Sequence, residues 1–197
     1  GAGNVGWNAA MIAAGMGAEV TLLDRNIERL RALEPTLPGR ITTLASNRGS
    51  VERSVAESDL VVGAVLLPGG RAPTVVSESM VAAMRPGSVV ADVAIDQGGC
   101  IETARETSHH DPVYTVHGVQ HYCVGNIPGA VPVTSTSALT NATLPFLVAL
   151  ATRGAVEACR ADPVLAHGLN TEGGAVVNAV VADSLGMAAG TPRHLAA

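Results

Sequence analysis

A glycine-rich segment and a carboxylate that follows it are the first residues whose spacing could do chemistry. Gly1, Gly3 and Gly6 form the pattern G-x-G-x-x-G, and Asp24 follows them at close to the ~20-residue spacing of dinucleotide-binding turns. In such turns the glycines let the backbone approach a pyrophosphate, a helix N-terminus attracts its charge, and the acid binds ribose hydroxyls. The alternative is a plain glycine-rich turn with an aspartate that caps the next helix. The pattern by itself is weak, so its structural context decides.

A second carboxylate lies on a glycine-containing loop. Asp96 belongs to the segment Ala94-Ile-Asp-Gln-Gly-Gly-Cys100, which follows an apolar run over residues 88–93. Open α/β sheets bind ligands at the carboxyl ends of their strands, where a carboxylate can orient water or exchange a proton. The alternative is an aspartate that binds the N–H groups of its own turn. Asp92, inside the strand pattern, is interpreted as structural.

Histidines and cysteines gather in the middle of the chain, which raises the question of a metal. Their spacing matches no zinc pattern, and we expect no metal site and a structural role for Cys100. The histidines and cysteines concerned are His109, His110, His117, His121, Cys100 and Cys123.

Short apolar runs alternate with amphipathic segments in the first half of the chain, which predicts right-handed βαβ units and a parallel sheet. The run over residues 60–67 is continuously apolar, as in a strand buried on both faces. Predicted strands cover residues 19–24, 41–44, 60–67 and 88–93. Predicted helices cover residues 7–16, which Gly17 ends, and begin near Ile27, Ser50 and Ser77.

The alternation of apolar runs and amphipathic segments ends after residue 94. We expect short strands at 113–117 and 121–124, an irregular proline-rich stretch at 126–132, a helix over 141–152 and a partly helical remainder, notably 174–186.

The predicted fold class is α/β, a Rossmann-type doubly wound parallel sheet. The chain begins on Gly1 without Met, and the strand that should precede the glycine turn, in the middle of the sheet, is expected to be missing. We therefore predict a fragment. Residues 1–133 would form a truncated dinucleotide-binding domain, and residues 134–197 a C-terminal helical segment that returns to an incomplete second domain.

Composition narrows the function further. The chain has a net charge of −5, 47% hydrophobic and 2% aromatic residues, which argues against nucleic-acid and anionic-membrane binding and against disorder. All twelve basic residues are Arg, so a Walker-type phosphate loop is excluded. The three cysteines and the lack of a signal peptide predict a cytoplasmic protein. No apolar run reaches the ~20 residues of a membrane span, so we expect no membrane segment.

Several longer motifs carry a family resemblance over essentially the whole chain. GAGNVG, LLDRNIERL, DLVVGAVLLPGGRAP, VADVAIDQGGC, HYCVGNIPGAVP and TSALTNATLPF closely resemble alanine dehydrogenase. The resemblance implies reversible, NAD-dependent oxidative deamination of L-alanine to pyruvate and ammonia by a homo-oligomer, a homohexamer in the family. The alternatives are the nucleotide-binding domain of a proton-translocating transhydrogenase and a catalytically inactive NAD-binding module.

The resemblance also implies roles for individual residues. Asp24 would bind the adenosine ribose, Arg29 and Ser46 would lie near the adenine, and Asp96 would be the catalytic aspartate. The other implied cofactor contacts are Val65, Leu66, Val93, Ala94, Ile95, Asp96, Arg105, Val124, Gly125, Asn126 and Ile127, beside Gly1, Gly3 and Gly6 of the turn. The arginine, lysine and histidine that handle the substrate in the family lie before the glycine turn, so we expect this chain to carry only the cofactor part of the site.

Overall fold

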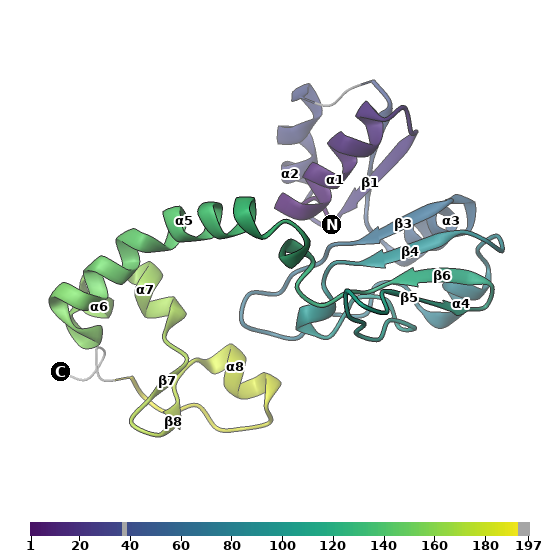
Figure 1. Cartoon of the computed structure of the whole chain (residues 1–197). Coiled ribbons are helices and arrows are strands. Elements are labelled where there is room, and N and C mark those ends of the chain that lie inside the picture. Colours follow the sequence, from purple (N-terminus) through teal and green to yellow (C-terminus); the bar gives the residue numbers. More distant parts are fainter. Residues whose placement is uncertain (37–38, 193–197) are drawn as a thin grey trace. The chain divides into compact units, whose positions relative to one another are not determined.

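The computed structural model describes residues 1–36 and 39–192, which form two compact units (Figure 1). The first unit comprises Gly1–Leu67 and Arg71–Ile127, and the second comprises Pro68–Gly70 and Pro128–Ala197. The first unit therefore ends at Ile127, before the domain boundary predicted at residue 133. The last five residues of the predicted C-terminal segment, 193–197, lie outside the described part.

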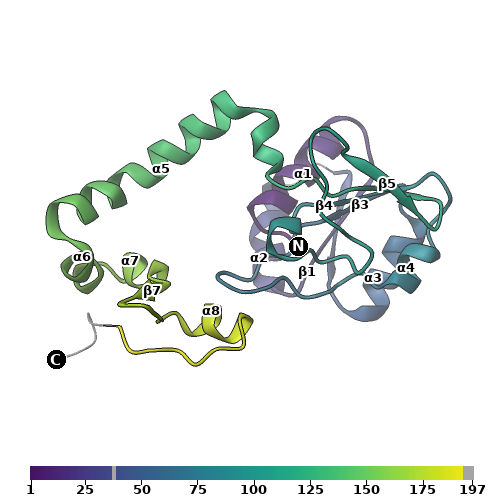
Figure 2. The ribbon, with the colours of Figure 1, turned by 60° about the horizontal axis from the view of Figure 1, so that its bottom comes forward.

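Parallel strands and intervening helices build the first unit (Figures 1 and 2). Its strands are β1 (Val20–Asp24), β2 (Ile41–Ala45), β3 (Leu60–Gly63), β4 (Val89–Asp92), β5 (Val113–Val116) and β6 (Val119–Tyr122). Its helices are α1 (Asn4–Gly15), α2 (Ile27–Leu33), α3 (Arg48–Glu57) and α4 (Glu78–Ala82), with 3₁₀ turns η1 (Glu34–Thr36) and η2 (Ile95–Gln97).

The strands form two sheets. β1 pairs with β2 in parallel, and the second sheet has the order β3-β4-β6-β5. β3, β4 and β6 run parallel, whereas β5 is antiparallel to β6. Helix α1 contacts both β1 and β3 and so joins the two sheets. The predicted α/β fold of Rossmann type, with parallel strands, is confirmed.

Side-chain caps explain where most of these helices begin. Asn26 accepts a hydrogen bond from the backbone N–H of Arg29 at the start of α2. Asn47 and Ser50 form a reciprocal capping box at α3, and Ser77 caps α4. Such caps satisfy N–H groups that have no partner within the helix. Gly17 follows the last turn of α1 with φ +94°, the left-handed conformation that commonly ends a helix.

Two apolar clusters hold the first unit together. The larger one joins Val51 and Val55 of α3 and Met80 and Val81 of α4 to the sheet, where Val90 of β4 is completely buried. The smaller one packs Ala2 of the glycine turn, Ala10 of α1 and Leu30 of α2 against Leu22 of β1. The apolar runs and amphipathic segments that alternate in the sequence thus form parallel strands with helices packed against them.

Turn geometry shifts two predicted strands. His117 and Gly118 have φ values of +52° and +76°, as in the two-residue hairpin turns that match strand twist. β6 therefore begins at Val119 rather than at residue 121. β3 ends at Gly63 rather than at residue 67, because Gly63 pairs with Asp92, the last residue of β4.

The second unit is mainly helical. The 3₁₀ turn η3 (Ile127–Ala130) leads into it from the last residue of the first unit. The second unit contains α5 (Pro132–Arg153), α6 (Ala155–Ala161), α7 (Pro163–Gly168) and α8 (Ala179–Ser184), with the hairpin of β7 (Thr171–Glu172) and β8 (Ala175–Val176). The predicted start of a helix at residue 141 is wrong, because Pro132 occupies the first helical turn of α5, where proline is favourable. The predicted helix over 174–186 is shorter, since Gly173 and Gly174 with positive φ turn the β7–β8 hairpin.

Helix α5 carries many exposed apolar side chains. None of its residues is buried, and Val133, Leu139 and Leu147 are 82%, 64% and 58% exposed. Its 22 residues and mean hydropathy of 1.2 make it, among the described residues, the one helix long and apolar enough to cross a membrane. The expectation that no apolar segment reaches that length is therefore wrong on length and composition, although one such helix is weak evidence of a span.

Candidate functional site

The predicted site residues follow the carboxyl ends of the strands. Asp24 ends β1, Ser46 follows β2, Val65 and Leu66 follow β3, and the segments 93–96 and 124–127 follow β4 and β6. Parallel pairing brings strand ends of the same polarity to one edge of each sheet. Most of the implied cofactor contacts thereby lie along one edge of the first unit.

The glycine turn links these strand ends. The backbone N–H of Ala2 donates to Oδ2 of Asp24 at 2.7 Å, while Gly1 lies so close to Ala64 that a Cβ would stand 2.6 Å from the Ala64 carbonyl oxygen. A Cβ on Gly6 would lie within 3.0 Å of the Gly1 carbonyl group, so neither position admits a side chain without backbone movement.

Gly3 is different, because nothing lies within 4 Å of the Cβ position. The open space borders the N-terminus of α1, where Gly3 is the N-cap residue and no side chain of the described residues caps the helix. Unpaired N–H groups and the positive end of the helix dipole attract a negatively charged group. This arrangement fits a phosphate.

Hydrogen bonds fix the carboxylate of Asp24. Burial by itself would raise its pKa, but the N–H groups of Asn26 and Ala2 and nearby positive charge, including Arg29, lower the pKa below its ordinary value. Ser46 is held beside it, since its backbone N–H donates to the Asp24 carbonyl oxygen at 2.9 Å. The site therefore presents an ionised acceptor at neutral pH, as recognition of ribose hydroxyls requires.

Asp96 connects the loops after β4 and β6. Its side chain is exposed and lies in the 3₁₀ turn η2. Oδ1 accepts the backbone N–H of Asn126 at 2.9 Å, and the Asn126 carbonyl oxygen lies 3.2 Å from Nε2 of His109. Asn126 itself has φ +52°, so two partners stabilise a backbone conformation that is uncommon for residues other than glycine.

Arg105 precedes Thr107, whose backbone hydrogen-bonds to Cys123 and Gly125 in the loop after β6. The Arg105 guanidinium lies 3.9 Å from the ring centroid of Tyr114, and the Arg105 N–H donates to the phenol oxygen at 2.7 Å. The Tyr114 ring stacks in turn on His121 at 4.9 Å. A stacked ring restricts a guanidinium and leaves its N–H groups available.

His121 is a completely buried member of this stack. Nδ1 lies 3.0 Å from the Val119 carbonyl oxygen, which can only accept, so Nδ1 carries the proton and Nε2 accepts from the hydroxyl of Thr103 at 2.7 Å. Burial lowers the pKa of His121, which favours this neutral form. Hydrogen-bond partners also hold His109, His117, Cys100 and Cys123. No group of three metal-binding side chains occurs among the described residues.

The sequence assigned Asp92 a structural role without showing its partners, and it did not indicate Tyr114. Asp92 is completely buried and binds the loop that carries Asp96. Its signal was available, because a carboxylate within a buried strand needs hydrogen-bond partners. Tyr114 could not be paired with Arg105 without the β5–β6 register.

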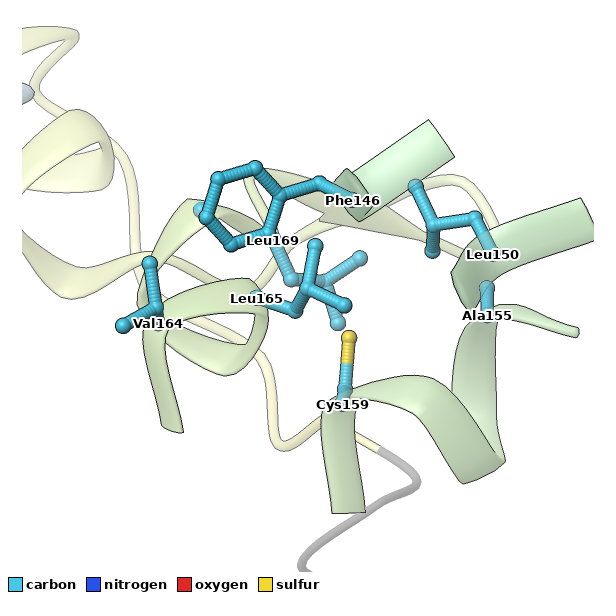
Figure 3. A pocket seen from close by; sticks show the side chains of 8 residues that line it. Phe146, Leu150, Ala155, Cys159, Val164, Leu165 and Leu169 are labelled. Atoms are coloured by element: carbon cyan, nitrogen blue, oxygen red, sulfur yellow. The ribbon is translucent and has the colours of Figure 1, made fainter. Parts of the chain in front are cut away.

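A separate cavity of about 300 Å³ lies in the second unit. Figure 3 shows apolar side chains of α5, α6 and α7 around it, including Phe146, Leu150 and Leu165, with the thiol of Cys159 directed inward. The lining carries neither the acids nor the open helix N-terminus of the site in the first unit. We therefore assign the candidate nucleotide site to the first unit.

The chain is similar to dehydrogenases along nearly its whole length. It is 52% identical over 187 residues to the alanine dehydrogenases of Halomonas elongata and Mycobacterium tuberculosis strain H37Rv, which covers 95% of this chain and 50% of each relative. The chain thus spans about half the length of the curated relatives it matches.

Comparison with solved structures also finds dehydrogenase-like proteins. An L-alanine dehydrogenase structure matches with a TM-score of 0.81 at 50% identity, covering 94% of this chain and 51% of the other. A transhydrogenase from Sinorhizobium meliloti matches with a TM-score of 0.67 at 29% identity, covering 91% and 48%. The family model described as "Alanine dehydrogenase/PNT, C-terminal domain" matches residues 1–179. The chain therefore belongs to the alanine dehydrogenase/PNT C-terminal domain family.

Proposed function

We propose that this chain is the NAD-binding part of an alanine dehydrogenase, which converts L-alanine reversibly to pyruvate and ammonia. The observation that carries the proposal is the open, uncapped N-terminus of α1 beside the carboxylate of Asp24. The glycine turn offers room and N–H groups for a pyrophosphate, while the acid suits a ribose with free hydroxyls. The two alanine dehydrogenase relatives support this assignment.

The residues of this chain would bind and orient the reactants. A bound NAD supplies the hydride acceptor, and the protein supplies position and electrostatics. The loops 93–96 and 124–127 would border the nicotinamide, and Asp96 would accept or return protons while water adds to the oxidised substrate. The N–H of Asn126 leaves one oxygen of Asp96 free for this role.

A transhydrogenase nucleotide domain is the second candidate, and a catalytically inactive NAD-binding module is the third. The structural match to the transhydrogenase has lower identity and TM-score than the match to L-alanine dehydrogenase, which favours the dehydrogenase. The substrate groups would come from outside this chain, so we expect the chain alone to be inactive. An arginine, lysine and histidine before the glycine turn in the complete protein would support the dehydrogenase.

We also propose that the protein is a cytoplasmic homo-oligomer, a hexamer by family resemblance. The buried free cysteines Cys100, Cys123 and Cys159 suit a reducing compartment. The exposed apolar residues of α5 suit a surface that another part of the protein or another subunit covers. Light scattering of the complete protein would give its oligomeric state, and a monomer would contradict the proposal.

The test of the catalytic assignment is Asp96→Asn in the complete protein. The amide retains an oxygen for the N–H of Asn126, so we expect the NAD dissociation constant to stay within a few-fold. Loss of the acid/base group should lower kcat by about 10²–10⁴-fold, roughly 3–5 kcal/mol of barrier. Asp59→Asn is the matched control, because this exposed carboxylate pairs with Arg85 before β3, at the opposite strand ends.

Two results would count against the assignment. A kcat of Asp96→Asn within about threefold of wild type would remove Asp96 from the catalytic residues. Absence of NAD-dependent alanine oxidation in the complete wild-type protein, with NAD binding intact, would favour the inactive binding module.

A further inference from the structure

A buried carboxylate that the proposed chemistry does not use lies at the end of β4. Asp92 is completely buried. Oδ2 accepts the backbone N–H groups of Cys100 and Ile101 at 2.7 and 2.9 Å. Oδ1 accepts the N–H of Ala94 at 3.0 Å and lies 3.5 Å from the Cys100 thiol. The hydrogen bonds of this carboxylate therefore come from neutral donors in one loop.

These donors come from both ends of the loop. Ala94 begins the segment that carries Asp96, and Cys100 and Ile101 end it. Between them, the Ala94 carbonyl oxygen accepts the N–H groups of Gln97 and Gly99 at 2.9 and 3.0 Å. A single side chain thus ties the two ends of a closed loop together.

The surroundings are shaped to hold this carboxylate. Gly63 lies opposite Asp92 in the β3–β4 register, and a Cβ there would stand 2.6 Å from the Cys100 sulfur. Gly99 has φ +76°, and a Cβ on it would stand 3.0 Å from Oδ2 of Asp92. Both neighbours leave no room for another side chain, so the backbone approaches Asp92 closely.

We propose that Asp92 is a positioning residue, whose buried carboxylate holds the loop 94–101 in the closed form that presents Asp96 to the reaction. The inference rests on the proposed function for the role of Asp96. Burial of a carboxylate is costly unless hydrogen bonds compensate, and an apolar residue would serve a purely structural strand better. The backbone N–H donors at both ends of the loop compensate for this burial and hold the two ends together.

An amide could not replace the carboxylate. Asn offers one acceptor oxygen, and its NH₂ group would face either the Ala94 N–H or the N–H groups of Cys100 and Ile101. Burial and the charge of Asp92 raise the pKa of the Cys100 thiol to about 12. The thiol therefore stays protonated and donates to Asp92, which adds a further donor that an amide nitrogen would oppose.

The experiment compares Asp92→Asn, Asp96→Asn and the double variant in the complete protein, with Asp59→Asn as the control. Amide hydrogen exchange of Ala94, Cys100 and Ile101 reports the loop directly, without need of turnover. We expect these amides to exchange at least tenfold faster in Asp92→Asn, kcat to fall about 10- to 1000-fold, and the NAD dissociation constant to stay within a few-fold. In the Asp96→Asn background, Asp92→Asn should cost less than about twofold more in kcat.

The outcomes separate the two proposals. Wild-type exchange and kcat in Asp92→Asn would overturn the positioning role. Multiplied losses in the double variant would make Asp92 a structural residue that acts independently of Asp96. Wild-type turnover in Asp96→Asn would reject the catalytic role of Asp96, and with it the positioning proposal, even if the exchange result shows that the loop is held.

A milder variant covers the case in which Asp92→Asn does not fold. Cys100→Ala leaves the carboxylate and its three N–H donors but removes the thiol. Loop amides should then exchange about two- to fivefold faster and kcat should fall by a similar factor, while Cys100→Ser restores both. Unchanged exchange and turnover in Cys100→Ala would contradict the inference.

Discussion

Replacement of Asp24 by Asn should change which dinucleotide the site prefers. The carboxylate accepts N–H groups from Ala2 and Asn26 and has a lowered pKa, so it is ionised at neutral pH. A 2′-phosphate on the ribose would meet this charge directly. Two unit charges about 5 Å apart at an effective dielectric constant of about 40 interact by about 1.7 kcal/mol, and a phosphate carries about −1.5 to −2.

The repulsion is therefore about 3 kcal/mol, so the wild type should prefer NAD over NADP by about 100-fold in kcat/KM. Asp24→Asn removes the charge and should lower this ratio to below about tenfold. The variant also weakens the turn, because an amide oxygen can replace only one of the two accepted hydrogen bonds. That loss affects both cofactors equally and cancels in the ratio. Arg25, which follows Asp24, is the residue that could favour a 2′-phosphate.

The assay is steady-state kinetics of the complete protein with each cofactor at saturating L-alanine. Asp59→Asn serves as the control and should leave the ratio unchanged, because its carboxylate pairs with Arg85 away from the site. A wild type that uses both cofactors equally would refute the electrostatic reasoning. A ratio in Asp24→Asn within twofold of the wild-type ratio would refute it as well.

Five further variants test the glycine turn and the aromatic stack. Gly3→Ala should keep the melting temperature, since its Cβ meets only open space in the protein, but should weaken NAD binding by tenfold or more, because that space is the proposed place of the phosphate. Gly6→Ala should instead lower the melting temperature, because its Cβ would overlap a carbonyl oxygen. Calorimetry combined with titration of NAD separates the two effects. Tyr114→Leu should weaken NAD binding about two- to tenfold if the ring orients Arg105. Tyr114→Phe keeps the ring and should weaken NAD binding less. Equal losses of NAD affinity in the two variants would assign the effect to the hydroxyl. Burial lowers the pKa of His121, so the unfolded chain binds more protons than the folded chain below about pH 6.5, and stability falls as the pH drops through that value. The melting temperature of His121→Gln should therefore decline less than that of the wild type between about pH 7 and about pH 5. Parallel pH profiles of the two proteins would contradict the buried neutral histidine.

The local sequence determined much of the first unit. Alternating apolar runs and caps such as Asn47 with Ser50 specify their own helices and strands, because their hydrogen bonds and periodicity are local. Gly1, Gly3, Gly6 and Asp24 indicated a nucleotide-binding turn through their spacing together with the predicted helix and strand between them. The position of Asp96 after a strand followed from the predicted parallel sheet, whereas the resemblance to alanine dehydrogenase implied the remaining candidates.

Only the tertiary structure decided the interactions between segments that are distant in the chain. Strand pairing sets Asp92 opposite Gly63, and the turn at His117 sets the register that stacks Tyr114 on His121. The start of α5 at Pro132 was also missed, since proline reads as a breaker until its place in the first helical turn is known. Local propensity cannot give these results, because the energy of each contact depends on a partner whose position the whole fold determines.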